Sequence, residues 1–269
     1  MPKVQSNSIE IFYETFGAGE PLLLITGTGG DSRCWMPLVE SGQNRYQCLL
    51  PYNRGTGLSD WPEPPYTVPQ MADDMVGLLD ALDIPKAHIA GHSLGSAIGQ
   101  ELAIRYPQRV HTLLLLSTWD QTAAYPHLRW QFELRKSLLE RNELELYLTL
   151  SNLYLFSPAF VNRHSDLMLT RKQELLNILT PERVRTLIGH LEADLAHDAA
   201  DRLYQIRVPT LILVGEYDTI TWPDYARAVQ AWIPNAELIV LKDAAHMLMN
   251  EVPEALNQAI YSFLKRYPL

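Results

Sequence analysis

Gly91-His92-Ser93-Leu94-Gly95 is the stretch of sequence that decides the fold. An apolar segment over residues 88–90 precedes it, and a helical pattern over residues 96–105 follows it. A Gly-x-Ser-x-Gly motif between a strand and a helix is typical of a nucleophile elbow, a sharp and strained turn that exposes the serine Oγ. Its glycines let neighbouring backbone approach, because they carry no Cβ. The pattern predicts that Ser93 is a nucleophile and that the amide of Leu94 binds an oxyanion.

Two later strands deliver the groups that a serine nucleophile needs. The apolar run 209–215 reads as a buried parallel strand and is followed by Asp218, and the run 238–241 is followed by His246. Because the carboxyl ends of parallel strands meet at one rim of a sheet, Asp218 and His246 are expected beside Ser93. An imidazole takes the serine proton, and a buried carboxylate holds that imidazole in the required tautomer. The sequence therefore predicts a catalytic triad.

The triad partners have alternative interpretations. Asp218 is also placed to cap the helical pattern that begins near Trp222, and Glu216 is a competing acid. Glu216 stands one residue past the strand, a position that more often points to the other face. His92 neighbours the nucleophile, but its alternation relative to Ser93 favours a packing role. The remaining histidines read as surface or core residues without metal-binding spacing, so no metal site is predicted: His88, His111, His127, His164, His190 and His197.

A glycine-rich loop follows the early apolar strand within residues 21–30. It lacks the Lys-Ser/Thr pair of a phosphate-binding P-loop and the spacing of a dinucleotide fingerprint. The sequence instead predicts that the backbone amide of Thr28 is the second oxyanion donor, beside that of Leu94. Such a donor is worth about 3 kcal/mol in the transition state.

Length and composition indicate a single soluble globular domain. The chain has 269 residues, of which 47% are hydrophobic and 20% charged. With 22 basic and 31 acidic residues, the net charge of −9 argues against nucleic acid or anionic lipid as a partner. Residues 1–16 do not resemble a signal peptide, no stretch reaches the roughly 18–20 apolar residues of a membrane span, and Cys34 and Cys48 suggest no disulfide framework. Cytoplasmic residence is therefore expected.

Strand and helix patterns alternate along the chain and are interrupted once. Strands are predicted over residues 9–16, 22–26, 47–52 and 112–117, with an amphipathic helix over 71–82. Residues 119–204 form a wholly helical block, which predicts a cap over the active site. Residues 1–118 and 205–269 are then the core, expected as a mostly parallel sheet with helices on both faces.

The chain as a whole resembles the α/β-hydrolase family, whose members carry the triad in the order Ser, Asp, His. Within it, the chain looks like the branch of 3-oxoadipate enol-lactonases and aminoacrylate hydrolases of pyrimidine breakdown. Family members usually have His-Gly in the oxyanion loop, where this chain has Thr26-Gly27, and an aspartate where it has Tyr52. The features shared with the branch are Gly27-Thr28-Gly29-Gly30, Trp35, Asn53-Arg54-Gly55-Thr56-Gly57, the elbow motif, and Trp119 after a strand.

Substrate choice is expected to depend on aromatic residues in the cap and the catalytic loops. Trp119 follows a strand end directly, and one of the cap arginines is a candidate anchor for a substrate carboxylate. The residues predicted to line the pocket are Trp35, Trp119, Trp130, Tyr217 and Trp222.

The predicted function is hydrolysis of a carboxylic ester or lactone through an acyl-enzyme, with no cofactor and no metal. The expected partner is a small-molecule substrate, and a homodimer is left open. Carbon–carbon bond hydrolysis or lyase chemistry on the same triad is one alternative, because fold and motif do not exclude it. A ligand receptor that turns over slowly is another. Halide-releasing and epoxide-opening relatives are disfavoured, because they use an aspartate where Ser93 stands.

Overall fold

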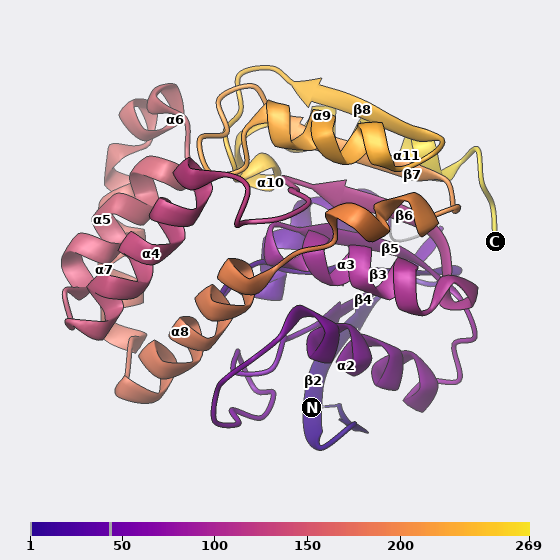
Figure 1. Cartoon of the computed structure of the whole chain (residues 1–269), viewed down its shortest axis with the longest axis horizontal. Helices are drawn as coiled ribbons and strands as arrows, with labels where there is room; N and C mark the ends of the chain where they lie inside the picture. Colours follow the sequence, from indigo (N-terminus) through magenta and orange to yellow (C-terminus); the bar gives the residue numbers. More distant parts are fainter. Residues whose placement is uncertain (1, 43–44) are drawn as a thin grey trace.

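The computed structural model describes residues 2–42 and 45–269. These residues form an eight-stranded sheet in the order β1-β2-β4-β3-β5-β6-β7-β8 (Figure 1). β2 pairs antiparallel with β1 and β4, and the other neighbouring strands are parallel. The mostly parallel α/β fold expected from the sequence is confirmed. The strands are β1 (Lys3–Ser6), β2 (Ile9–Phe16), β3 (Glu20–Ile25), β4 (Tyr46–Pro51), β5 (Ala87–His92), β6 (Val110–Leu116), β7 (Thr210–Gly215) and β8 (Ala236–Leu241).

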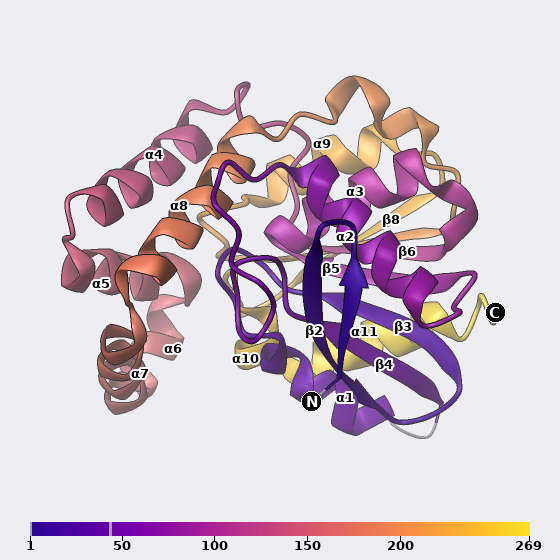
Figure 2. The ribbon, with the colours of Figure 1, turned by 90° about the horizontal axis from the view of Figure 1, so that it is seen from below.

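Helices cover both faces of the sheet, as Figure 2 shows. Within β3, Leu23 and Ile25 pack into the core beneath α2, α3 and α9, whereas Leu22 and Leu24 pack toward α1 and α11. Because successive side chains of a strand point to opposite faces, a strand that is covered on both sides is expected to be mostly apolar. These helices are α1 (Met36–Gly42), α2 (Val68–Ala81), α3 (Leu94–Arg105), α9 (Pro223–Trp232) and α11 (Pro253–Leu264), with short helical turns at η1 (Ser32–Trp35), η2 (Pro107–Arg109), η3 (Ala200–Gln205) and α10 (Leu248–Glu251).

Some element ends differ from the sequence prediction. The sequence predicts a helix from residue 71, whereas α2 begins at Val68, because the Thr67 side chain accepts a hydrogen bond from the Gln70 amide and caps the helix. β1 is not predicted. It is a four-residue edge strand with only Ser6 buried, so it has no apolar pattern to detect.

Helices α4 to α8 lie between β6 and β7 in the chain and extend to one side of the sheet in both views (Figures 1 and 2). We call them the cap helices. At their base, Gln121 and Asp198 form an antiparallel bridge, and the Ala199 amide donates to the Asp120 carbonyl at 2.8 Å. The entering and leaving segments therefore run side by side. The cap helices are α4 (Pro126–Glu140), α5 (Leu144–Leu155), α6 (Pro158–Arg163), α7 (Ser165–Ile178) and α8 (Pro181–Ala196). Across the described ranges, no helix has the length and apolarity needed to span a membrane.

Candidate active site

Ser93 occupies a strained turn between β5 and α3. Its backbone has φ 55° and ψ −124°, a conformation that costs energy for any residue with a Cβ. A Cβ at Gly91 would lie 2.0 Å from the Gly95 carbonyl oxygen, and a Cβ at Gly95 would lie 2.3 Å from the Ile25 carbonyl oxygen. Both glycines of the motif are therefore required by close backbone contacts, and together they allow the elbow to form against β3.

His246 and Asp218 form a buried pair at the same rim of the sheet. His246 Nδ1 lies 2.9 Å from Asp218 Oδ2. Asp218 also accepts hydrogen bonds from the Ile220 and Thr221 amides and from the Thr221 hydroxyl, each at 2.9 Å. Burial alone would raise the pKa of Asp218, but the His246 imidazole and these donors lower it below its usual value. Asp218 is thus an ionised acceptor, and because His246 Nδ1 faces it, Nε2 is the nitrogen left for another partner.

The competing acid lies elsewhere. Glu216 is exposed, and its Oε2 is 3.5 Å from the Asp243 amide. The structure therefore brings Asp218, and not Glu216, to the imidazole.

Two residues beside the pair support His246, although the sequence did not single them out for this. His92 Nε2 donates to the His246 carbonyl at 2.9 Å, and the two ring centroids are 4.8 Å apart. Burial and the neighbouring imidazole lower the pKa of His92 to about 3, so His92 is neutral. Thr221 Oγ1 lies 3.4 Å from His246 Nδ1 as well as donating to Asp218. Nothing in the local sequence indicates the contacts with His246, because His92 and Thr221 lie 154 and 25 positions before it in the chain.

The loop of residues 26–30 packs directly against the elbow. A Cβ at Gly27 would lie 2.9 Å from the Ser93 Cβ. The Gly29 amide donates to His190 Nδ1, so it is not free for a substrate. Leu94 is the first residue of α3, and the first amides of a helix lack partners within it. The predicted oxyanion donors, the amides of Thr28 and Leu94, therefore lie on the two segments that meet at Ser93.

Gly27→Val should lower kcat/KM about a hundredfold or more, because the added Cβ would displace the loop from the elbow and remove an oxyanion donor. Thr28→Ser should cost less than about tenfold, since it keeps both the backbone amide and the hydroxyl. Steady-state kinetics of the two variants with one ester checks this. A Gly27→Val variant that keeps wild-type kcat/KM would separate this loop from catalysis.

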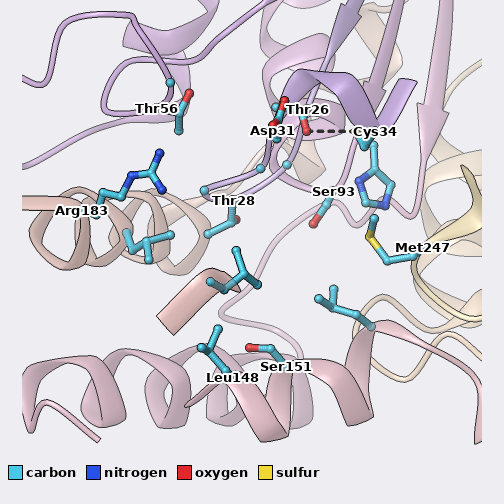
Figure 3. Close-up of a pocket in the computed structure, with 18 of the residues that line it drawn as sticks. Thr26, Thr28, Asp31, Cys34, Thr56, Ser93, Leu148, Ser151, Arg183 and Met247 are labelled. Carbon is cyan, nitrogen blue, oxygen red and sulfur yellow. Dashed lines mark hydrogen bonds between the residues drawn. The ribbon is translucent and has the colours of Figure 1, made fainter. Parts of the chain in front are cut away.

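A cavity of about 460 Å³ lies between the elbow and the cap helices. Figure 3 shows Ser93 and Thr28 on one side and Leu148 and Ser151 of α5 on the opposite side. His246 also lines it. Apolar side chains of α5, α7 and α8 form much of the cap side, together with arginines: Leu148, Leu155, Leu175, Ile178, Leu187, Arg135, Arg171 and Arg183.

The structure corrects the predicted pocket lining: of the described residues that surround this cavity, none is one of the five aromatics. Trp35 is buried in the core near α1 and α11. Trp119 is buried with its indole N–H donating to Thr122 Oγ1. Trp130 is 66% exposed, and Tyr217 and Trp222 are also exposed. The sequence marks large aromatic residues near catalytic loops, but it does not show which way each side chain points. The aromatic residues that do line the cavity are Tyr52 and Tyr147, beside the aliphatic and charged side chains of the cap helices.

Asp194 of α8 is a second buried acid near the triad. Its Oδ2 accepts a hydrogen bond from Thr28 Oγ1 at 2.6 Å, while Oδ1 has no hydrogen-bond partner in the described part of the chain. Burial raises the pKa of Asp194 to about 6. The folded protein therefore binds this proton more tightly than the unfolded chain, in which an aspartate titrates near 4.

The free energy of unfolding of the wild type should fall relative to that of Asp194→Asn as the pH rises from about 4 to above 6. A pKa shift of about two units corresponds to a fall of about 3 kcal/mol. The substitution keeps an acceptor for Thr28 and removes only the titration. Chemical denaturation of both proteins at the two ends of this range measures the difference. A stability difference that does not change with pH would contradict the raised pKa.

A strained serine, a histidine and a buried carboxylate at the carboxyl rim of a parallel sheet define the α/β-hydrolase class of protein. The chain belongs to this family: the profile described as "alpha/beta hydrolase fold" matches residues 20–251. Its membership of this family makes it a hydrolase.

Comparisons with individual proteins agree with this family assignment. The chain is 32% identical to "Putative carbamate hydrolase RutD" of Azorhizobium caulinodans, with 98% of each chain covered. It is 30% identical to the protein of the same name from Caulobacter vibrioides, with 95% of each covered. Among solved structures, the enol-lactonase from Burkholderia xenovorans LB400 superposes with a TM-score of 0.88 at 23% identity, covering 98% of this chain and all of that one. The predicted family is confirmed.

Proposed function

We propose that the protein hydrolyses a carboxylic ester or lactone through an acyl-enzyme on Ser93. The observation that carries this proposal is the 2.9 Å contact between His246 Nδ1 and Asp218 Oδ2 at the rim where the strained Ser93 lines the same cavity. His246 Nε2 takes the Ser93 proton as Oγ attacks the carbonyl carbon, and Asp218 stabilises the imidazolium that forms.

The steps that follow use the same groups. The amides of Thr28 and Leu94 hold the oxyanion of the tetrahedral intermediate, and His246 returns its proton to the leaving alcohol oxygen as the C–O bond breaks. Water, deprotonated by His246, then attacks the acyl-enzyme and releases the acid and free Ser93. No cofactor is needed. A carbamate carbonyl suits the same steps, which is consistent with the name of the RutD relatives.

Two arginines support a substrate that carries a carboxylate. Arg135 of α4 is 7% exposed, and its Nε has no hydrogen-bond partner among the described residues. Arg171 of α7 lines the same cavity, donates to Asn152 Oδ1, and has its pKa lowered by burial. Within the described ranges, neither forms a salt bridge with an acidic side chain. The charge of Arg135 acts on the Asp194 carboxyl, but the two groups form no salt bridge. A substrate carboxylate bound directly would therefore stabilise the buried Arg135 and the half-buried Arg171.

Wild-type enzyme should prefer p-nitrophenyl hemisuccinate over p-nitrophenyl butyrate in kcat/KM by about tenfold or more. Arg135→Met should remove that preference while changing butyrate hydrolysis by less than about threefold. Arg129→Met is the matched control, because Arg129 lies on the same helix, is exposed, and pairs with Glu133. An equal loss with both esters would assign Arg135 to folding rather than to anion binding.

A panel of esters, lactones and carbamates tests the proposed function itself, with the mass of the Ser93 peptide as the readout for the acyl-enzyme. Multiple turnovers would exclude a slow-turnover receptor. Carbon–carbon bond hydrolysis is the other candidate, because a meta-cleavage product hydrolase shares the fold with a TM-score of 0.79. Turnover of a meta-cleavage product without any ester or lactone turnover would favour it. Cytoplasmic residence and a homodimer stay predictions.

A further inference from the structure

One face of α8 contacts the loops that surround the elbow. Thr186, His190 and Asp194 are spaced four residues apart, so they lie along one face of the helix, and all three side chains are buried. Figures 1 and 2 both place α8 between the other cap helices and the core. We call these three residues the α8 stripe.

His190 connects two loops through its two ring nitrogens. The Gly29 amide lies 3.0 Å from Nδ1, and the Arg54 carbonyl oxygen lies 2.8 Å from Nε2. An amide only donates and a carbonyl only accepts, so Nδ1 is unprotonated and Nε2 carries the proton. Burial lowers the pKa of His190 to about 4, which agrees with a neutral ring. This tautomer is the one that forms both hydrogen bonds, to Gly29 and to Arg54, at the same time.

The other two residues of the α8 stripe bind the same two loops. Asp194 Oδ2 accepts from Thr28 Oγ1 at 2.6 Å, and Thr186 Oγ1 donates to the Gly55 carbonyl at 3.0 Å. α8 thus binds the side chain of Thr28 and the backbone amide of Gly29. On its other side, the same loop packs against Ser93 through Gly27.

We propose that His190 and Asp194 are positioning residues that hold the oxyanion loop in its catalytic geometry, so that the cap takes part in transition-state stabilisation. Thr186 fixes α8 to the neighbouring loop at Gly55. The inference rests on the proposed function, because the oxyanion loop matters only if a carbonyl is attacked by Ser93. An oxyanion donor acts most strongly in the transition state, so a displaced loop lowers kcat more than it raises KM.

Two substitutions of His190 separate its contacts. His190→Asn places a carbonyl oxygen near the position of Nδ1, so the Gly29 amide keeps its acceptor. His190→Gln places an amide nitrogen near the position of Nε2, so only the hydrogen bond to the Arg54 carbonyl is kept. His190→Gln should lower kcat about tenfold or more with KM within about twofold, and His190→Asn should retain kcat within about threefold.

His88→Gln is the matched control, because His88 is also fully buried between two partners, Thr112 and Glu20, at the far end of β5. It should lower thermal stability without a selective loss of kcat, measured per folded molecule by circular dichroism and kinetics. Equal kcat in His190→Asn and His190→Gln, or a loss confined to KM, would overturn the inference.

Hydrogen exchange gives a readout that does not depend on activity. Peptides covering residues 26–30 should exchange faster in His190→Gln than in wild type or His190→Asn, because the Gly29 amide loses its acceptor. Unchanged exchange in His190→Gln would also overturn the inference. Faster exchange in a protein that hydrolyses no ester, lactone or carbamate would leave the positioning role standing and contradict the proposed function instead.

Discussion

Ser93→Ala should abolish covalent labelling by an organophosphonate and lower kcat by roughly a millionfold. The substitution removes the hydroxyl that the elbow presents to the cavity, and neither His246 nor the oxyanion amides can replace it. The fold should persist, because the Ser93 backbone keeps its hydrogen bond to the Leu116 carbonyl and alanine adds no atoms. Labelling followed by intact-protein mass, together with steady-state kinetics, measures both effects.

Ser6→Ala is a matched control for that experiment. Ser6 is also a buried serine, but its hydroxyl donates to the Asp74 carbonyl at the edge of the sheet, far from the elbow. It should lower stability somewhat and leave labelling intact. Retained labelling in Ser93→Ala would remove Ser93 from the mechanism and with it the proposed function.

The strands and the elbow could be predicted because their causes are local in sequence. A strand buried on both faces is mostly apolar, and β7 shows this as the continuous apolar run of residues 211–214. The elbow needs glycines at two fixed positions around Ser93, and the short contacts that a Cβ would make at Gly91 and Gly95 show why. The meeting of Ser93, Asp218 and His246 follows from where parallel strands end.

The cavity lining could not be predicted because it depends on how the cap helices are rotated and packed. Trp130 and Arg135 lie on the same helix, yet Trp130 faces solvent and Arg135 lines the cavity. The periodicity of α4 does not identify which of its faces turns toward a substrate.

The α8 stripe illustrates a different limit. Its spacing of four is visible in the sequence, but its partners are loop residues more than a hundred positions earlier. His190 therefore reads as an ordinary core or surface histidine until the fold brings Gly29 beside it.

Asp218→Asn should lower kcat by about ten-thousandfold through the wrong imidazole tautomer. The Ile220 and Thr221 amides both donate to Asp218 Oδ1, so the carbonyl oxygen of an asparagine would stay there and its NH₂ would take the place of Oδ2. That NH₂ would face His246 Nδ1 and donate to it. The imidazole proton would then reside on Nε2, which could no longer accept the Ser93 proton.

Glu216→Gln is the matched control for that change. It also converts a carboxylate into an amide in the loop that follows β7, which ends at Gly215. Glu216 is exposed and interacts with the Asp243 amide rather than with His246, so kcat should stay within about twofold of wild type. Kinetics of both variants with one ester, supported by thermal unfolding, distinguishes the two acids. A near-wild-type Asp218→Asn beside a folded but inactive Glu216→Gln would reverse the assignment of the triad acid, since the acid that orients the imidazole is the one of the two whose loss stops catalysis.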